Sequence, residues 1–258
     1  MKSIKILAIG NSFSDDCMEY VYDILKSVGV AEVKLGNLYI GGCSLSMHVE
    51  NAKGDIPAYE YRVNTDGEWK TTPNFKMSDA ILSEEWDFIF TQQFSGQSGQ
   101  TETYGDLEIL LAYVKGLAKG TPKYGWQMTW AYAQDTDHPW FAKYDENQGT
   151  MYESIVKSVQ ENVVTNADIY AVIPSGTVIQ NMRSSYLGDT LNRDGFHLSY
   201  DVGRYATGLA TVRALTGLSI EKTVFAPTGV NEKEKQTAIK AVEYAMAQPF
   251  QVTSMTEK

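Results

Sequence analysis

The sequence is poor in cysteine and histidine, and it contains no long apolar run. Cys17 and Cys43 are its only cysteines, so we expect neither a disulfide framework nor a cysteine-rich zinc site. The three histidines lack the spacing of metal ligands, and we expect neither a metal nor another cofactor. The apolar run at residues 6–9 is shorter than a signal-peptide core, and no stretch approaches the ~20 apolar residues of a membrane span.

Acidic residues outnumber basic ones, which gives the chain a formal net charge of −10. Such a surface repels nucleic acid phosphates and anionic lipids, so we expect no nucleic acid partner and no membrane partner. We expect a soluble protein, cytoplasmic if the printed N-terminus is native and periplasmic or secreted if a signal peptide was removed. The hydrophobic fraction of 43% is sufficient for one core, which predicts a single domain over residues 1–258 and leaves the oligomeric state open.

Apolar segments alternate with amphipathic ones along the chain. Five apolar segments have the pattern of strands that are buried on both faces, at residues 4–9, 33–40, 86–91, 123–130 and 168–173. Apolar residues at helical spacing predict helices at 15–28, 77–82, 107–117, 151–164, 200–215 and 232–247. The alternation predicts an α/β protein of three α/β/α layers, with a five-stranded parallel sheet between helices.

Residues 59–72 have a different character from the rest of the chain. Two runs with strand propensity flank Asn64-Thr65-Asp66-Gly67, and an Asp-Gly pair in that position is a hairpin signal. We interpret this segment as a small hairpin excursion from the main sheet.

Several polar residues directly follow predicted strands. Ser12, Gly42, Gln92 and the loop after Trp130 all occupy such positions. Because ligands of parallel sheets bind at the carboxyl ends of the strands, we expect these residues at one functional edge.

Ser12 lies where the first predicted strand turns into a helix. A serine there can expose its hydroxyl, and the free N–H groups of the helix start can point at a developing oxyanion. The alternative is an ordinary serine at a helix start, and nearby Ser14 is assigned to helix capping. The segment lacks Gly-x-Ser-x-Gly and Gly-Lys-Ser/Thr, which argues against an α/β-hydrolase elbow and against a phosphate-binding loop.

Asp194 and His197 supply the acid and base that a serine nucleophile requires. They are three positions apart in Asp194-Gly195-Phe196-His197, so the carboxylate can reach the imidazole Nδ1 and leave Nε2 for the nucleophile. The alternative is a polar loop ahead of a capped helix.

The combination of Gly10-Asn11-Ser12-Phe13-Ser14, Gly41-Gly42-Cys43-Ser44 and Asp194-Gly195-Phe196-His197 resembles the SGNH (GDSL-like) hydrolase superfamily. The details are similar to a branch of that superfamily best represented in gut Bacteroidetes. The resemblance implies a flavodoxin-like sheet and a catalytic triad of Ser12, Asp194 and His197. It also implies an oxyanion hole formed by the N–H groups of Ser12 and Gly42.

One sequence block departs from that family. The usual Gly-x-Asn-Asp after the third strand is replaced by Thr91-Gln92-Gln93-Phe94. A glutamine carboxamide can donate the same hydrogen bond from one methylene further out, so Gln92, or otherwise Gln93, is expected to complete the oxyanion hole. The alternative is that both amides bind loop backbone.

Aromatic residues cluster around the fourth predicted strand and its loop. Aromatic faces can stack on sugar rings, so we expect Trp130 and Tyr132 to contact substrate, although most of the cluster should be core packing. The sequence therefore predicts a serine ester hydrolase that removes a short acyl group, most simply acetyl, from a carbohydrate or another small-molecule ester. Alternatives are a lysophospholipase, thioesterase or arylesterase of the same superfamily, or a non-catalytic carbohydrate-binding protein on this fold.

Overall fold

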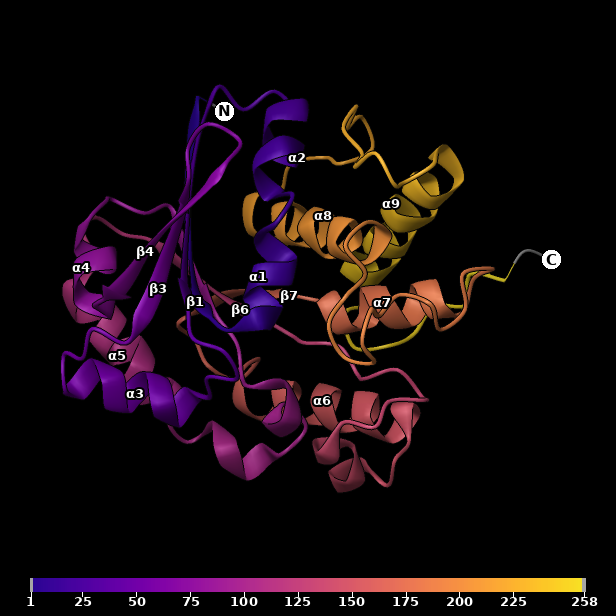
Figure 1. The fold of residues 1–258 in the computed structure, drawn as a ribbon, viewed down its shortest axis with the longest axis horizontal. Helices are drawn as coiled ribbons and strands as arrows, with labels where there is room; N and C mark the ends of the chain where they lie inside the picture. The colour runs from indigo at the N-terminus through magenta and orange to yellow at the C-terminus, as the bar shows by residue number, and fades with distance from the viewer. Residues whose placement is uncertain (1, 257–258) are drawn as a thin grey trace.

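The computed structural model describes residues 2–256 and contains a seven-stranded sheet of order β4-β3-β2-β1-β5-β6-β7 (Figure 1). The strands are β1 (Ser3–Gly10), β2 (Glu32–Tyr39), β3 (Tyr59–Asn64), β4 (Trp69–Phe75), β5 (Phe88–Thr91), β6 (Lys123–Gln127) and β7 (Ile169–Ile173).

Five of these strands are parallel, as the apolar segments predicted. β1 lies in the middle, paired with β2 on one side and β5 on the other. Ile6 and Leu7 on β1 point to opposite faces and are both fully buried, because helices cover the sheet on both sides.

The hairpin at residues 59–72 is not an excursion from the sheet. β3 pairs antiparallel with β2, and β4 pairs antiparallel with β3, so the hairpin extends the sheet from five strands to seven. In the extended sheet one face of β3 is buried, so that Tyr59 and Tyr61 lie in the core while Glu60 is exposed. The turn contains Gly67 at φ +99°, a conformation that glycine adopts without steric cost.

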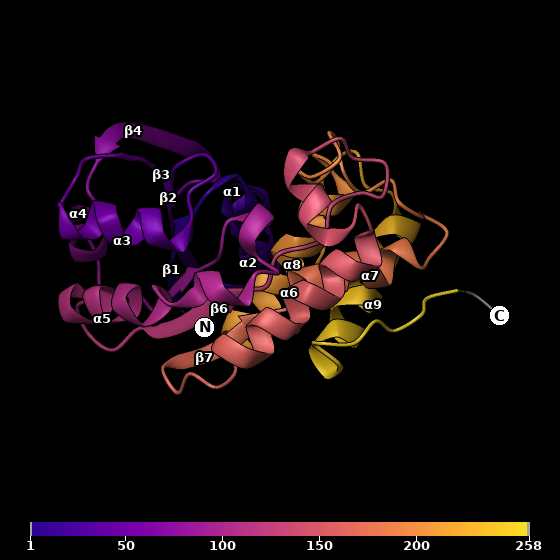
Figure 2. The same cartoon turned by 90° about the horizontal axis from the view of Figure 1, so that it is seen from below.

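The described residues form nine α-helices, eight of which make up the layers on either side of the sheet (Figure 2), while α6 packs against the 3-10 helices Thr101–Tyr104 and Pro139–Tyr144. α1, α2 and α8 pack on one face, with α7 and α9 against α8, and α3, α4 and α5 pack on the other face. Their bounds are α1 (Ser12–Met18), α2 (Val21–Ser27), α3 (Leu45–Lys53), α4 (Met77–Leu82), α5 (Leu107–Leu117), α6 (Gln148–Asn162), α7 (Ser175–Arg183), α8 (Val202–Thr216) and α9 (Glu232–Ala247). None of these helices has the length and apolar character needed to cross a membrane.

The helix predicted at residues 15–28 is instead two helices, α1 and α2. α1 begins earlier than predicted, at Ser12, because the Asn11 side chain caps it by accepting a hydrogen bond from the Phe13 N–H. Ser14 is therefore not the cap; its hydroxyl lies within hydrogen-bond distance of Asn37 Oδ1 and the Asn11 carbonyl. The sequence also gave no indication of α7, which follows Pro174 and starts with Ser175 and Gly176.

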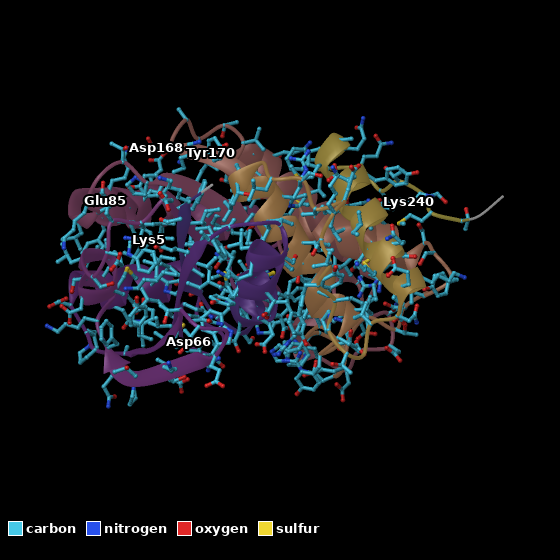
Figure 3. The ribbon with its side chains drawn as sticks, turned by 90° about the horizontal axis from the view of Figure 1, so that it is seen from above. Lys5, Asp66, Glu85, Asp168, Tyr170 and Lys240 are labelled. Carbon is cyan, nitrogen blue, oxygen red and sulfur yellow. The ribbon has the colours of Figure 1, made fainter. Side chains whose placement is uncertain are left out.

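Charged residues occupy the amino-terminal edge of the sheet, which faces the viewer in Figure 3. Lys5 and Lys34 both pair with Glu84, and Lys115 pairs with Asp168. These pairs are partly or largely exposed and contribute little to stability. The carboxyl-terminal edge, at the bottom of Figure 1, carries the site described next.

Candidate active site

A cavity of about 360 Å³ opens at the carboxyl-terminal edge of the sheet. Its walls come from the loops after β1, β2, β5 and β6 and from the loop before α8, and they consist of Asn11, Ser12, Asp15, Tyr39, Gly41, Gly42, Phe94, Ser95, His138, Arg193, Phe196 and His197. Cavities of about 450 Å³ beside α9, about 480 Å³ at the amino-terminal edge and about 380 Å³ beside α5 are larger, but none of them is lined by a histidine. The chemistry of the described residues therefore points to the smaller cavity.

Ser12 reaches this cavity because the chain turns from β1 directly into α1 there. As the first residue of α1, its N–H lacks an intrahelical partner and points out of the helix start. The side chain is partly exposed, and its hydroxyl makes no hydrogen bond to another described residue. Ser12 thus presents an unengaged hydroxyl and an unengaged N–H to the same space.

Asp194 holds His197 through one compact turn. Asp194 Oδ2 lies 2.7 Å from His197 Nδ1, while Oδ1 accepts the His197 N–H at 2.8 Å and the Phe196 N–H at 3.3 Å. Burial opposes the ionised form, but the hydrogen bonds from His197 outweigh it and leave the pKa of Asp194 below its usual value. A carboxylate can only accept, so Nδ1 carries the proton and the Nε2 lone pair is free to act as a base.

The structure brings Ser12 and His197 to one cavity although 185 positions separate them (197 − 12). The ring of Phe13, the residue after Ser12, lies 6.0 Å from the ring of His197. No hydrogen bond joins Ser12 Oγ to His197, and catalytic contacts of this kind often tighten only when substrate binds.

A buried carboxylate joins the segment of Ser12 to the segment of Asp194 and His197. Asp16, one helical turn after Ser12, is fully buried, and its Oδ2 accepts the Leu198 N–H at 2.8 Å. Its Oδ1 accepts from Arg204 Nε at 2.8 Å and from Arg193 Nη1 at 3.0 Å. Because Arg193 and Leu198 flank Asp194 and His197, Asp16 fixes that loop against α1.

Trp130 makes a second connection between α1 and the loop of His197. The burial of Trp130 and Tyr132 corrects the prediction that they contact substrate. The rings of Trp130 and Phe13 stack at 4.1 Å, and Trp130 Nε1 donates to the Phe196 carbonyl at 2.7 Å. Trp130 and Tyr132 are fully buried and do not line the cavity, so neither can stack on a sugar in this conformation. Trp130 fills the interior between α1 and the loop before α8, and Tyr132 packs against Phe141 and Phe196, contacts that the sequence alone does not reveal.

The two glutamines expected at the oxyanion hole also lie outside the cavity lining. Gln93 is engaged in loop structure, with its Oε1 accepting the N–H groups of Leu45 and Phe94 and its Nε2 donating to Thr103. Gln92 is fully buried, and its Nε2 donates to Asn11 Oδ1 at 2.6 Å. Gln93 thus binds loop backbone, as the alternative stated. Gln92 instead binds the side chain of Asn11, which caps α1.

Asn11 connects this network to the turn at Gly42. Its Oδ1 accepts from Gln92 and from the Phe13 N–H, and its Nδ2 donates to the Cys43 carbonyl at 2.9 Å. Gly42 has φ +64°, and its N–H donates to no described residue. Gln92 therefore orients Asn11 and, through Asn11, the Gly42 turn at the edge of the cavity.

Replacing Gln92 by methionine tests whether Gln92 donates directly to the oxyanion or only orients Asn11. For the ester hydrolysis that the sequence predicts, we expect kcat to fall less than about 10-fold, since loss of a direct oxyanion donor typically costs ~10²–10³. Gln93→Met is the matched variant, and we expect it to lower the free energy of unfolding by about 1–3 kcal/mol because two buried N–H groups lose their acceptor. A 10²-fold or larger loss of kcat for Gln92→Met would identify it as a donor.

His138 is a histidine of the cavity wall that the sequence pattern did not single out. Its only signal was that it is one of three histidines, in an aromatic loop without a motif.

Among residues 2–256, no group of three or more His, Cys, Asp or Glu side chains is arranged to hold a metal ion.

Comparison with known proteins identifies the family. Residues 5–245 match the family described as "Domain of unknown function (DUF4886)". The chain belongs to this family. The crystal structure of a DUF4886 family protein from Bacteroides uniformis superposes with a TM-score of 0.94 at 38% identity, over 98% of each chain. Comparison with curated proteins gives no match.

More distant structures share the fold of this DUF4886 protein. A candidate SGNH hydrolase from Slackia heliotrinireducens has a TM-score of 0.50 at 18% identity, over 82% of this chain and 98% of that chain. An acetylxylan esterase from Geobacillus stearothermophilus has a TM-score of 0.52 at 13% identity, over 83% of this chain and 94% of that chain. These structures confirm the fold that the resemblance implied, and the relative from Bacteroides uniformis agrees with the branch that the details indicated.

Proposed function

We propose that this protein is a serine ester hydrolase of the SGNH type, with Ser12 as nucleophile, His197 as general base and acid, and Asp194 as the residue that orients His197. The observation that carries the proposal is the cavity that Ser12 and His197 share, with Asp194 2.7 Å from His197 Nδ1. The SGNH-type fold of the DUF4886 family supports the same reading.

The reaction proceeds through an acyl-enzyme. Ser12 Oγ attacks the carbonyl carbon of the ester while His197 Nε2 takes the hydroxyl proton. The tetrahedral intermediate collapses, the bond to the alcohol oxygen breaks, and His197 returns the proton to the leaving alcohol. Water then attacks the acyl group in the same way and releases the acid and free Ser12.

The oxyanion is stabilised by backbone N–H groups. Ser12 N–H, at the start of α1, and Gly42 N–H, in its left-handed turn, are free of described partners and border the cavity. Both are fixed before substrate arrives, because Asn11 caps α1 and holds the Cys43 carbonyl. Preorganised donors of this kind stabilise charge that develops in the transition state.

The substrate class follows from the size of the cavity and from its walls. About 360 Å³ must hold both the acyl group and part of the alcohol, which favours a short acyl group such as acetyl. Tyr39, Phe94 and Phe196 supply aromatic surface next to polar groups, a combination suited to a carbohydrate. A structural neighbour is an acetylxylan esterase, which agrees with this assignment.

A chain-length series of p-nitrophenyl esters tests this proposal. We expect kcat/KM to fall by about 10-fold or more between acetate and octanoate, because a cavity that does not fit added methylenes forfeits their binding energy. A preference for octanoate would favour a lysophospholipase or thioesterase. A fluorophosphonate should label Ser12, as read by peptide mass spectrometry; absence of both labelling and hydrolysis would favour a non-catalytic carbohydrate-binding protein.

A further inference from the structure

His138 places a second imidazole in the wall of the cavity. It lies between β6 and α6, far in sequence from Asp194 and His197, and is half-buried. Its ring packs against Tyr132 at 4.7 Å and edge-on against Phe196 at 4.6 Å. These contacts fix the plane of the imidazole, so its free nitrogen has a defined direction.

The hydrogen bonding of His138 fixes which nitrogen carries the proton. His138 Nδ1 accepts the Trp140 N–H at 3.3 Å, which starts the 3-10 helix Pro139–Tyr144. An accepting Nδ1 leaves the proton on Nε2 in the neutral ring. Burial, and then the neighbouring His197, lower the pKa of His138, which favours that neutral form. Nε2–H makes no hydrogen bond to a described residue and is therefore an open, uncharged donor.

The position of His138 relative to His197 indicates which part of a substrate this donor meets. Both imidazoles contact the Phe196 ring, His138 at 4.6 Å and His197 at 4.0 Å between centroids. In the proposed reaction His197 delivers its proton to the leaving oxygen, so the alcohol lies beside His197. The oxyanion donors, Ser12 N–H and Gly42 N–H, come from other loops. His138 thus stands on the side of the leaving alcohol.

We infer that His138 binds the alcohol part of the substrate, with Nε2–H donating to a hydroxyl oxygen that neighbours the ester. This inference rests on the proposed function and deepens it, because it assigns recognition of the alcohol to one residue. The alcohol is a polyol of the carbohydrate class. Simple aryl or alkyl leaving groups carry no acceptor for this donor, and a site built to hydrogen-bond a hydroxyl discriminates against an analogue that lacks it.

The test compares two acetyl esters that differ only in the alcohol. Monoacetylated methyl xyloside offers hydroxyls beside the ester, and p-nitrophenyl acetate offers none. For His138→Phe we expect kcat/KM to fall about 10-fold with the xyloside ester, the size of one lost hydrogen bond, and to change less than about 2-fold with p-nitrophenyl acetate. An acetylated xyloside without the neighbouring hydroxyl should be hydrolysed equally by both proteins.

His138→Asn controls for damage to the loop. The asparagine oxygen can accept the Trp140 N–H as a helix cap, while the donor at the position of Nε2 is lost. We expect it to show the same substrate-dependent loss as His138→Phe, with a midpoint of thermal unfolding close to that of the unsubstituted protein.

Equal losses with both esters, or no loss with either, would overturn the assignment of His138. These results differ from a failure of the proposed function itself, in which the unsubstituted protein hydrolyses neither ester and the fluorophosphonate leaves Ser12 unlabelled.

Discussion

Replacing Ser12 by alanine is expected to lower kcat for p-nitrophenyl acetate by about 10⁴-fold or more, because the acyl-enzyme can no longer form. The protein should remain folded. The Ser12 hydroxyl has no partner among the described residues and alanine is a good helix former, so we expect the free energy of unfolding to change by less than about 0.5 kcal/mol.

Ser14→Ala is the matched control, since Ser14 lies two residues further along α1. Its buried hydroxyl is bonded to Asn37 Oδ1 and the Asn11 carbonyl, so we expect about 1 kcal/mol of lost stability and kcat retained within about 10-fold. Hydrolysis by Ser12→Ala at the rate of the unsubstituted protein, for every ester tested, would show that Ser12 is not the nucleophile.

The parts of the fold that follow from local pattern were predictable. The five parallel strands are apolar runs and were located from sequence within a few residues, although the edge strand β7 is only partly buried. The helices Met77–Leu82, Leu107–Leu117 and Glu232–Ala247 have the predicted bounds. The pairing of β3 with β2 depends on contacts between distant segments, which no local pattern specifies.

The same distinction separates the predictable from the unpredictable residues of the site. Ser12, Asp194 and His197 stand in recognisable blocks, and the cavity contains two of them with Asp194 bonded to His197. Gln92 and Trp130 also follow strands, but whether such a side chain faces the cavity or the interior depends on its neighbours. The carboxamide of Gln92 donates to Asn11. The indole of Trp130 stacks on Phe13 and donates to the Phe196 carbonyl.

Helix α1 is the element on which these interactions converge. Its first residue is the proposed nucleophile, and its cap, Asn11, holds the Gly42 turn. On the same helix, Phe13 stacks on Trp130, and Asp16 accepts the N–H of Leu198, the residue after His197. The geometry of the cavity is therefore sensitive to α1 more than to any of the loops alone.

Asp16→Ala tests this dependence, and its effect on stability should be large. Asp16 is fully buried and accepts hydrogen bonds from Arg193, Arg204 and the Leu198 N–H. Its removal leaves these donors without an acceptor. We expect the free energy of unfolding, from urea titration, to fall by about 3 kcal/mol. We also expect kcat to fall ~10–100-fold in protein that is still folded, because a small displacement of His197 is costly for catalysis.

Glu19→Gln provides the matched control for charge. Glu19 shares Arg204 with Asp16 at 3.4 Å, but it is partly exposed and makes no contact with the loop of His197. We expect it to cost less than about 1 kcal/mol and to leave kcat unchanged. Asp16→Asn should fall between the two, since its amide oxygen can still accept the Leu198 N–H while the ion pairs are lost. If Asp16→Ala lowers stability but folded protein keeps the full kcat, Asp16 stabilises the fold without positioning His197.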